Sequence, residues 1–292
     1  AFFAGPGLPV REFPGHETLP YDPFSPHPDL VSQRLEALAA LPDLRRGVLV
    51  VALEALIPRL PPRRYVAAHT LVLNPGQALE LAGFRQRLAE AGYAQVGQVM
   101  SHGEFAVRGS VIDLFPMGMD GPLRLDLFDQ DIDSIRRFDP ETQRSGAAEE
   151  RVRLLPAREF PTTPEAVKGF RQRWRARFEG DPMRSPVYRF VSEGLAPAGI
   201  EAWLPLFFDS VATLFDYLPA RASVVDLAGL DEAVPALWAD VEQRYEQRRH
   251  DLERPLLPPP ELFVPPAELA IALGRFACVA ARPDEAVTGL PD

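Results

Sequence analysis

The sequence is poor in residues that several classes of protein require. Cys278 is the only cysteine, which excludes an internal disulfide framework and suits a reducing compartment. A lone cysteine is usually a small buried apolar residue, so we expect Cys278 in the core. Lysine occurs once, at Lys168, and the other 30 of the 31 basic residues are arginines. Since no stretch of about eighteen apolar residues is present, we predict no membrane span and no membrane partner.

The motifs of nucleotide hydrolysis and metal binding are also missing. A phosphate-binding loop of the G-x-x-x-x-G-K-[ST] type needs a lysine, and Lys168 stands in AVKGF without a preceding glycine run. No serine stands in a G-x-S-x-G elbow. The histidines lack metal-ligand spacing, and we expect each to be a surface or capping residue: His16, His27, His69, His102 and His250. We therefore predict no catalytic residue, metal site or cofactor in this chain.

The net charge argues against electrostatic binding of nucleic acid over the whole surface of the chain. The net charge is -10, whereas counterion release from DNA needs clustered cations. The acidic side chains of Asp126, Asp129, Asp131 and Asp133 lack the ligand order of an EF-hand, so we interpret them as a solvated hairpin edge. The opening AFFAGPGLPV has neither Met nor a basic leader. We expect no signal peptide and a chain cut from a larger protein.

Hydrophobic patterning predicts α/β and α+β structure in three units, 1–69, 70–158 and 159–292. Each unit combines helical spacing with apolar strand-like runs. Expected helices include 28–41 with Asp29 as cap, 78–93 ending at Gly92, 163–178 with Thr163 as cap, and 230–255 apart from an early Pro235. Buried strands are expected within 46–53 and 214–227, and a partly polyproline II connector at 256–266.

The stretch from Arg108 to Phe138 reads as three strands joined by turns. Its alternation breaks at Gly109, which suggests a bulge or close backbone approach. The middle strand alternates between two faces: Leu123, Leu125 and Leu127 on one, and Arg124, Asp126 and Phe128 on the other. An exposed aromatic beside arginine is typical of an interface hot spot. Alternatively, Phe128 packs under the hairpin and Arg124 pairs with Asp126 or Asp133.

These residues also carry a family resemblance. EFAVRGSVIDLFP, with LRLDLFDQDIDSIRRFDPETQR after it, resembles the UvrA-interaction domain shared by UvrB and the transcription-repair coupling factor (Mfd) family. Residues 16–38, 46–60 and 196–227 resemble the flanking domains of the same coupling factors. UvrB has a Walker lysine loop, a DNA-opening hairpin and an acidic D-E-S-H-type motif. Here VVDLAGLDEAV stands in place of the acidic motif. PFSPHPD continues directly into LVSQRLEAL, so the hairpin is missing. Both departures favour the UvrB-homology module of the coupling factors.

The resemblance implies a degenerate helicase-like (P-loop NTPase-like) α/β scaffold. Residues 1–69 would be the remainder of its first UvrB-like domain, 70–158 an inserted α+β UvrA-interaction domain, and 159–292 a second UvrB-like domain with a proline-rich connector. By this resemblance Arg108, Arg124 and Phe128 belong to a surface that binds UvrA. The chain itself would lack ATPase activity and would act in transcription-coupled nucleotide excision repair.

The resemblance also implies a parent protein that is an ATP-driven DNA translocase of the bacterial cytoplasm. Its motor domains would use ATP and magnesium and would reach DNA and stalled RNA polymerase through parts absent from this chain. Those domains could also mask the UvrA-binding surface. Two alternatives stay open: a part of a UvrB-like helicase that still handles nucleotide and DNA, and an internal autoinhibitory clamp against the motor domains.

Overall fold

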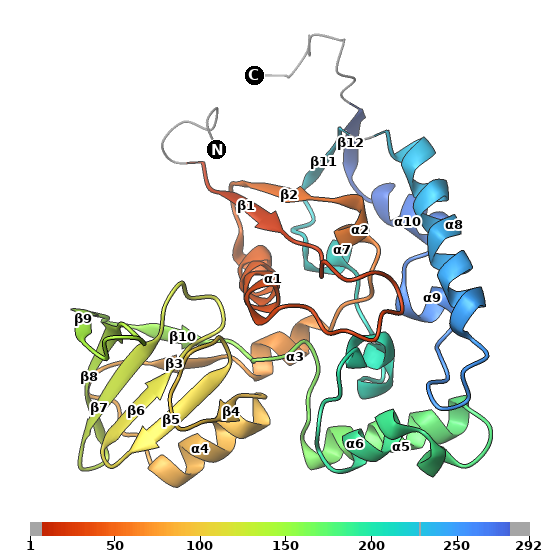
Figure 1. The fold of residues 1–292 in the computed structure, drawn as a ribbon. Helices are drawn as coiled ribbons and strands as arrows, with labels where there is room; N and C mark the ends of the chain where they lie inside the picture. The colour runs from red at the N-terminus through yellow and green to blue at the C-terminus, as the bar shows by residue number, and fades with distance from the viewer. Residues whose placement is uncertain (1–7, 228, 281–292) are drawn as a thin grey trace.

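The computed structural model describes residues 8–227 and 229–280, and it shows two lobes joined side by side (Figure 1). One lobe is a six-stranded sheet with a helix against it. The other combines helices with two short parallel sheets. The mixed α/β character predicted from the sequence is therefore confirmed. The three expected units stay a prediction, and their outermost parts, 1–7 and 281–292, lie outside the described residues.

The sheet lobe is a meander in the order β4-β5-β6-β7-β8-β9. Neighbouring strands are antiparallel except β4 and β5, which are parallel. A separate antiparallel pair consists of β3 and β10. The elements are β3 (Leu71–Leu73), α4 (Leu81–Glu90), β4 (Ala94–Gln95), β5 (Glu104–Arg108), β6 (Val111–Leu114), β7 (Leu123–Phe128), β8 (Asp131–Phe138), β9 (Ser145–Ala148) and β10 (Val152–Leu154).

Side chains alternate across β7 as the sequence predicts. Leu123 and Leu125 are fully buried in the core that includes α4, and Leu127 packs against it. A register shift between Asp126 and Leu127 leaves Asp133 of β8 without a partner on β7, so the alternation of β7 itself continues. The expected bulge at Gly109 is wrong, because Gly109 has φ +62° in the two-residue turn between β5 and β6.

The scaffold lobe contains the rest of the chain. Its sheets are β1 paired with β2, and β11 paired with β12, both parallel. The elements are β1 (Val10–Phe13), α1 (Pro28–Ala40), η1 (Leu41–Asp43), β2 (Val48–Val51), α2 (Leu53–Leu56), α3 (Arg63–Ala68), α5 (Pro164–Arg177), η2 (Pro182–Arg184), α6 (Pro186–Ser192), η3 (Ile200–Phe207), α7 (Leu214–Tyr217), β11 (Ser223–Asp226), α8 (Leu230–Arg248), α9 (Pro259–Leu262), α10 (Pro266–Leu273) and β12 (Ala277–Ala280).

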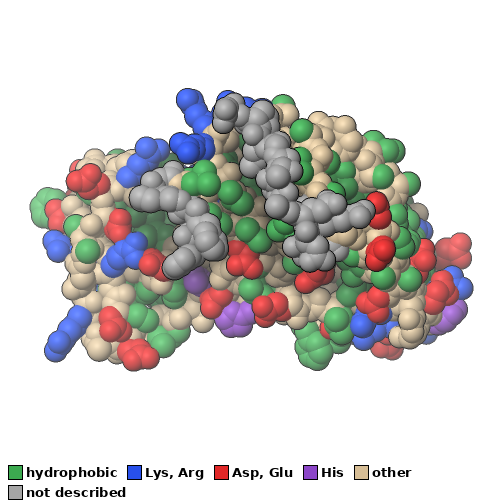
Figure 2. All heavy atoms as spheres, turned by 90° about the horizontal axis from the view of Figure 1, so that it is seen from above, with side chains coloured by type: hydrophobic (Ala, Val, Ile, Leu, Met, Phe, Trp, Pro, Cys, Tyr) green, Lys and Arg blue, Asp and Glu red, His purple; other side chains and the backbone are tan. Residues whose placement is uncertain are grey.

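Burial of the short parallel strands differs from the expectation. Val48 and Val50 of β2 are 41% and 51% exposed, and Val225 of β11 is 57% exposed. Each sheet has only two strands in the described part of the chain, so one face stays open. Cys278 lies on β12 and is exposed, so its expected burial is wrong. Seen from above, the described side chains that are visible include hydrophobic ones between acidic and basic ones (Figure 2).

Local predictions about helices had mixed outcomes. Thr163 caps α5 through a bond to the amide of Ala166, and Gly92 follows α4 with φ +89°, as expected. The cap of α1 is His27 and not Asp29, which lies in the first turn. Helix α8 runs through Pro235 without a break. All of these positions concern helix ends or interruptions, where neighbouring residue types compete for one role.

The expected proline-rich connector is packed into the scaffold. Segment 256–266 contains the short helix α9 and the start of α10, with extended prolines such as Pro265 between them. Leu257 and Val264 in this segment are buried, and the amide of Val264 donates to the carbonyl of Ile57 at 2.7 Å. The segment is thus part of the core rather than an external link.

A buried ion pair joins the lobes. Arg34 of α1 is fully buried, and its Nε donates to Oε1 of Glu159, five residues after the end of β10, at 2.6 Å. His16 lies 3.3 Å from the other carboxylate oxygen. Burial by itself raises the pKa of Glu159, but Arg34 and His16 outweigh it and lower that pKa to about 2. Burial and Arg34 lower the pKa of His16.

Two further contacts hold the sheet lobe on α1. The ring nitrogens of His102 lie 2.7 Å from Oδ1 of Asp29 and 2.7 Å from the carbonyl oxygen of Met119. The hydroxyl of Ser32 accepts a hydrogen bond from the amide of Gly118 at 2.8 Å. With the buried ion pair, these contacts set the orientation of the sheet against the scaffold.

Glu159→Gln should lower the free energy of unfolding by about 3 kcal/mol at pH 7, because it leaves Arg34 buried without a counter-charge. Arg34→Met/Glu159→Leu should lose far less, since no charge then stays buried. The folded-state pKa of Glu159 lies below its ordinary value, so its stabilisation is present above pH 4.5 and is lost as pH falls toward 2. Urea unfolding across this range measures both effects. A double variant as unstable as Glu159→Gln would contradict the prediction.

Candidate partner-binding surface

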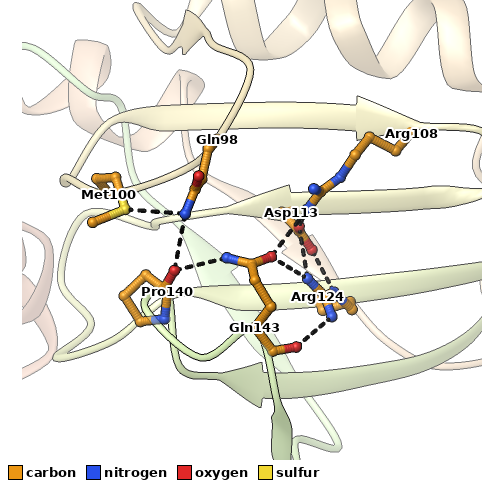
Figure 3. A network of polar contacts seen from close by, with 7 residues as sticks. All are labelled: Gln98, Met100, Arg108, Asp113, Arg124, Pro140 and Gln143. Carbon is orange, nitrogen blue, oxygen red and sulfur yellow. Dashed lines mark hydrogen bonds and ion pairs between the residues drawn. The ribbon is translucent and has the colours of Figure 1, made fainter.

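The centre of the candidate surface is a buried carboxylate. Asp113 lies on β6, on the sheet face opposite the core that includes α4, and its side chain is only 1% exposed. In the strand register it stands opposite Arg124 of β7 and Ala106 of β5. A carboxylate in such a position requires a cation and hydrogen-bond donors. Two arginines from the neighbouring strands provide them (Figure 3).

Arg124 forms a bidentate interaction with Asp113. Its Nε donates to Oδ1 at 2.6 Å and its Nη2 to Oδ2 at 2.9 Å. The guanidinium carbon lies 4.6 Å from the ring centre of Phe138. The hydrogen bonds with Asp113 raise the pKa of Arg124 above its ordinary value. Because only 16% of the Arg124 side chain is exposed, this arginine is largely a structural part of the sheet.

Arg108 shares the same carboxylate but stays accessible. Its Nη2 pairs with Oδ2 of Asp113 and donates to Oε1 of Gln143 at 3.2 Å. Half of the Arg108 side chain is exposed. Arg108 is the last residue of β5, where the chain turns into β6, so its guanidinium lies at the rim of the sheet. It can pair with a further carboxylate while Asp113 holds its position.

Gln143 completes the network and was not identified from the sequence. Its backbone carbonyl oxygen and its side-chain oxygen each accept a hydrogen bond from Arg124 at 3.1 Å. Its side-chain Nε2 donates to the carbonyl of Pro140 at 2.7 Å. Gln98 also donates to that carbonyl, at 3.1 Å (Figure 3). Gln143 has φ +60°, a conformation that no residue pattern in DPETQR indicates.

Phe128 ends β7 and is 78% exposed. The next residue, Asp129, has φ 56° in the two-residue turn that leads into β8, one of the turns expected within 108–138. The alternative in which Phe128 packs under the hairpin is therefore wrong. Arg124 pairs with neither Asp126 nor Asp133 but with Asp113 of the adjacent strand. Asp126 instead accepts a bond from Ser134 at 3.1 Å.

The structure brings two of the three predicted residues together. Arg108 and Arg124 meet at Asp113, whereas Phe128 lies four residues further along β7, about 13 Å away at the rise of a strand. All three stand on the same sheet face or its rim.

Within residues 8–227 and 229–280 there is no group of three or more His, Cys, Asp or Glu side chains that could hold a metal ion. The helices of this part include none long and apolar enough to span a membrane.

The same lobe coincides with a known domain family. Residues 71–160 match the family model described as the UvrB interaction domain. This match covers β3 to β10 and therefore includes Arg108, Arg124 and Phe128. The lobe is thus a UvrB interaction domain, a domain class that the sequence resemblance indicated.

Over most of its length the chain is similar to transcription-repair-coupling factors. It is 46% identical over 254 residues to the one from Escherichia coli and 45% identical to the one from Haemophilus influenzae. The first comparison covers 87% of this chain and 22% of the relative. The factor from Myxococcus xanthus is 34% identical over 271 residues. The chain therefore spans about a fifth of these coupling factors, and its predicted kinship with them is confirmed.

Asp113→Asn should destabilise the sheet lobe by about 3 kcal/mol, because Arg124 would lose its buried counter-charge and face Arg136, its register partner on β8. Asp126→Asn is the matched control on the same face, since Asp126 bonds only to Ser134 among the contacts described. Its effect should be within about 0.5 kcal/mol. Urea unfolding followed by far-ultraviolet circular dichroism compares the two. Equal losses would show that Asp113 does not organise the surface.

Proposed function

We propose that this chain recruits nucleotide excision repair by binding UvrA through the outer face of its UvrB interaction domain, in transcription-coupled repair. The observation that carries the proposal is Phe128, a ring 78% exposed at the end of β7 in a domain of this family. Exposing a large aromatic side chain on an ordered strand has no benefit for folding. Such a ring is typical of the buried centre of a protein interface.

The three predicted residues would have different roles in this interface. Four of the five N–H groups of Arg124 bond to Asp113 and Gln143, so Arg124 would mainly fix the sheet and position its neighbour. Arg108 would pair with a carboxylate of UvrA through its exposed half. Phe128 would fill an apolar pocket. An apolar anchor with a flanking arginine fits the composition of interface cores.

The scaffold lobe would serve to present this surface. We infer that it is a degenerate helicase-like fold that has no nucleotide hydrolysis of its own. The ATP, magnesium, DNA and RNA polymerase of the translocase activity would be bound by other domains of a longer protein in the bacterial cytoplasm. Those domains could also cover the Phe128 surface until repair is needed, since a partner that binds only the uncovered form shifts a pre-existing equilibrium.

Titration calorimetry of the chain with purified UvrA tests the proposal. Phe128→Ala should weaken binding about thirtyfold without changing the unfolding midpoint, because the ring makes few contacts in the free chain. Arg108→Ala should weaken binding by about tenfold. Arg124→Ala should lower both affinity and stability, since it removes the partner of Asp113.

Phe190→Ala is the matched control, because Phe190 is an aromatic 44% exposed on α6 in the other lobe. It should bind UvrA like the unchanged chain. A well-folded unchanged chain that does not bind UvrA would refute the proposal. Equal losses for Phe128→Ala and Phe190→Ala would show that the assigned residues are wrong.

A further inference from the structure

Helix α5 carries two rows of cations that differ in their partners. Its buried stripe consists of Val167, Phe170 and Trp174, three and four residues apart. On one flank of this stripe, Arg173 pairs with Asp209 and Arg177 pairs with Glu261. These two arginines serve the fold by linking α5 to neighbouring segments.

The opposite flank has no such partners. Lys168, Arg171 and Arg175 follow at spacings of three and four residues, so they lie on one side of the helix. We call these three residues the α5 basic flank. Among the described residues, none of the three forms an ion pair; the Nε of Arg171 donates only to the hydroxyl of Tyr188, at 3.3 Å. The basic flank is exposed except for Arg171, which is half-buried.

Tyr188 holds the two arginines of the flank in place. The guanidinium carbons of Arg171 and Arg175 lie 5.9 and 5.7 Å from the centre of its ring. Tyr188 itself is 1% exposed and anchored on α6. Guanidinium groups fixed over a ring lose less freedom on binding than free side chains do, and their N–H edges stay available for an anion.

The adjoining segments carry two further arginines. Arg184 of η2 and Arg189 of α6 are exposed, and neither forms an ion pair with a described residue. Phe190, next to Arg189, is 44% exposed. Acidic residues also stand in these segments, and Asp181 already bonds to the amide of Met183. The other acidic residues of this region are Glu165, Glu179 and Glu193.

We propose that the α5 basic flank, with Arg184, Arg189 and Phe190, binds the phosphate backbone of single-stranded nucleic acid. Lys168 and Arg175 are about 10 Å apart along the helix, so the flank offers a row of charges that suits a repeating anion. An exposed ring beside arginine is the arrangement on which an unpaired base stacks. Such unpartnered cations stand out in a chain of net charge -10.

This surface is separate from the one proposed for UvrA. In Figure 1, α5 and α6 lie at the bottom of the scaffold lobe, and β4 and α4 lie between them and strands β7 and β8. The two surfaces could therefore be occupied together, with one on a repair protein and the other on a strand. The inference depends on α5, η2 and α6 alone, so it stands or fails independently of UvrA binding.

Fluorescence anisotropy of a labelled oligothymidylate with the whole chain, over a range of salt, tests the inference. Lys168→Gln/Arg171→Gln/Arg175→Gln should weaken binding at least tenfold at low salt. The slope of log affinity against log salt should fall by about 2, since three phosphate contacts are lost. Phe190→Ala should weaken binding about fivefold if a base stacks on the ring, within the range of single stacking contacts.

Arg173→Gln/Arg177→Gln is the matched control, because it removes two arginines from the same helix on the paired flank. It should keep the affinity, as should Phe128→Ala. Circular dichroism checks that each variant is folded. Absence of binding by the unchanged chain, or equal losses for both flanks, would overturn the inference. Tighter binding to polyglutamate than to oligothymidylate would also overturn it, and would indicate an acidic protein as the partner.

Discussion

A buried carboxylate has to be paired, and this constraint organises both lobes. Asp113 and Glu159 are the acidic residues buried in the described part of the chain, and each has an arginine in direct contact. Leaving either charge unpaired would cost several kcal/mol, comparable to much of the stability of a domain. Glu159 thereby holds the UvrB interaction domain on α1. Asp113 holds the strands whose outer face carries the proposed binding residues.

The same reasoning separates structural arginines from those free to act. Arg34 and Arg124 are committed to buried acids, whereas Arg108 and the α5 basic flank keep exposed N–H groups. Since nearly all cations here are arginines, residue type alone does not distinguish the two sets. Partners do. The aromatic and the arginine on the polar face of β7 therefore have different roles. Arg124 supports the sheet, and Phe128 is free for a partner.

Much of the fold followed from local patterns. The period-two alternation of β7 and the turns expected between the strands of 108–138 define a meander within the interaction domain, although the turn at Gly109 was expected as a bulge. Predictions failed where burial depends on distant segments. Strands β2 and β11 look buried because they are continuous apolar runs, yet each has a single neighbour in the described chain. Cys278 is exposed for the same reason, and no local signal at these positions reports how many strands a sheet contains.

By itself the sequence determined the alternating faces of the sheet, the helix with its Thr163 cap, and the kinship with transcription-repair-coupling factors, because these depend on residues close together in the chain. Only the tertiary structure decided which charges meet. Asp113 and Arg124 are eleven residues apart, and Arg34 and Glu159 are 125 apart. Their pairing follows from strand register and lobe packing, which local spacing does not encode, and it sets which arginines remain available for partners.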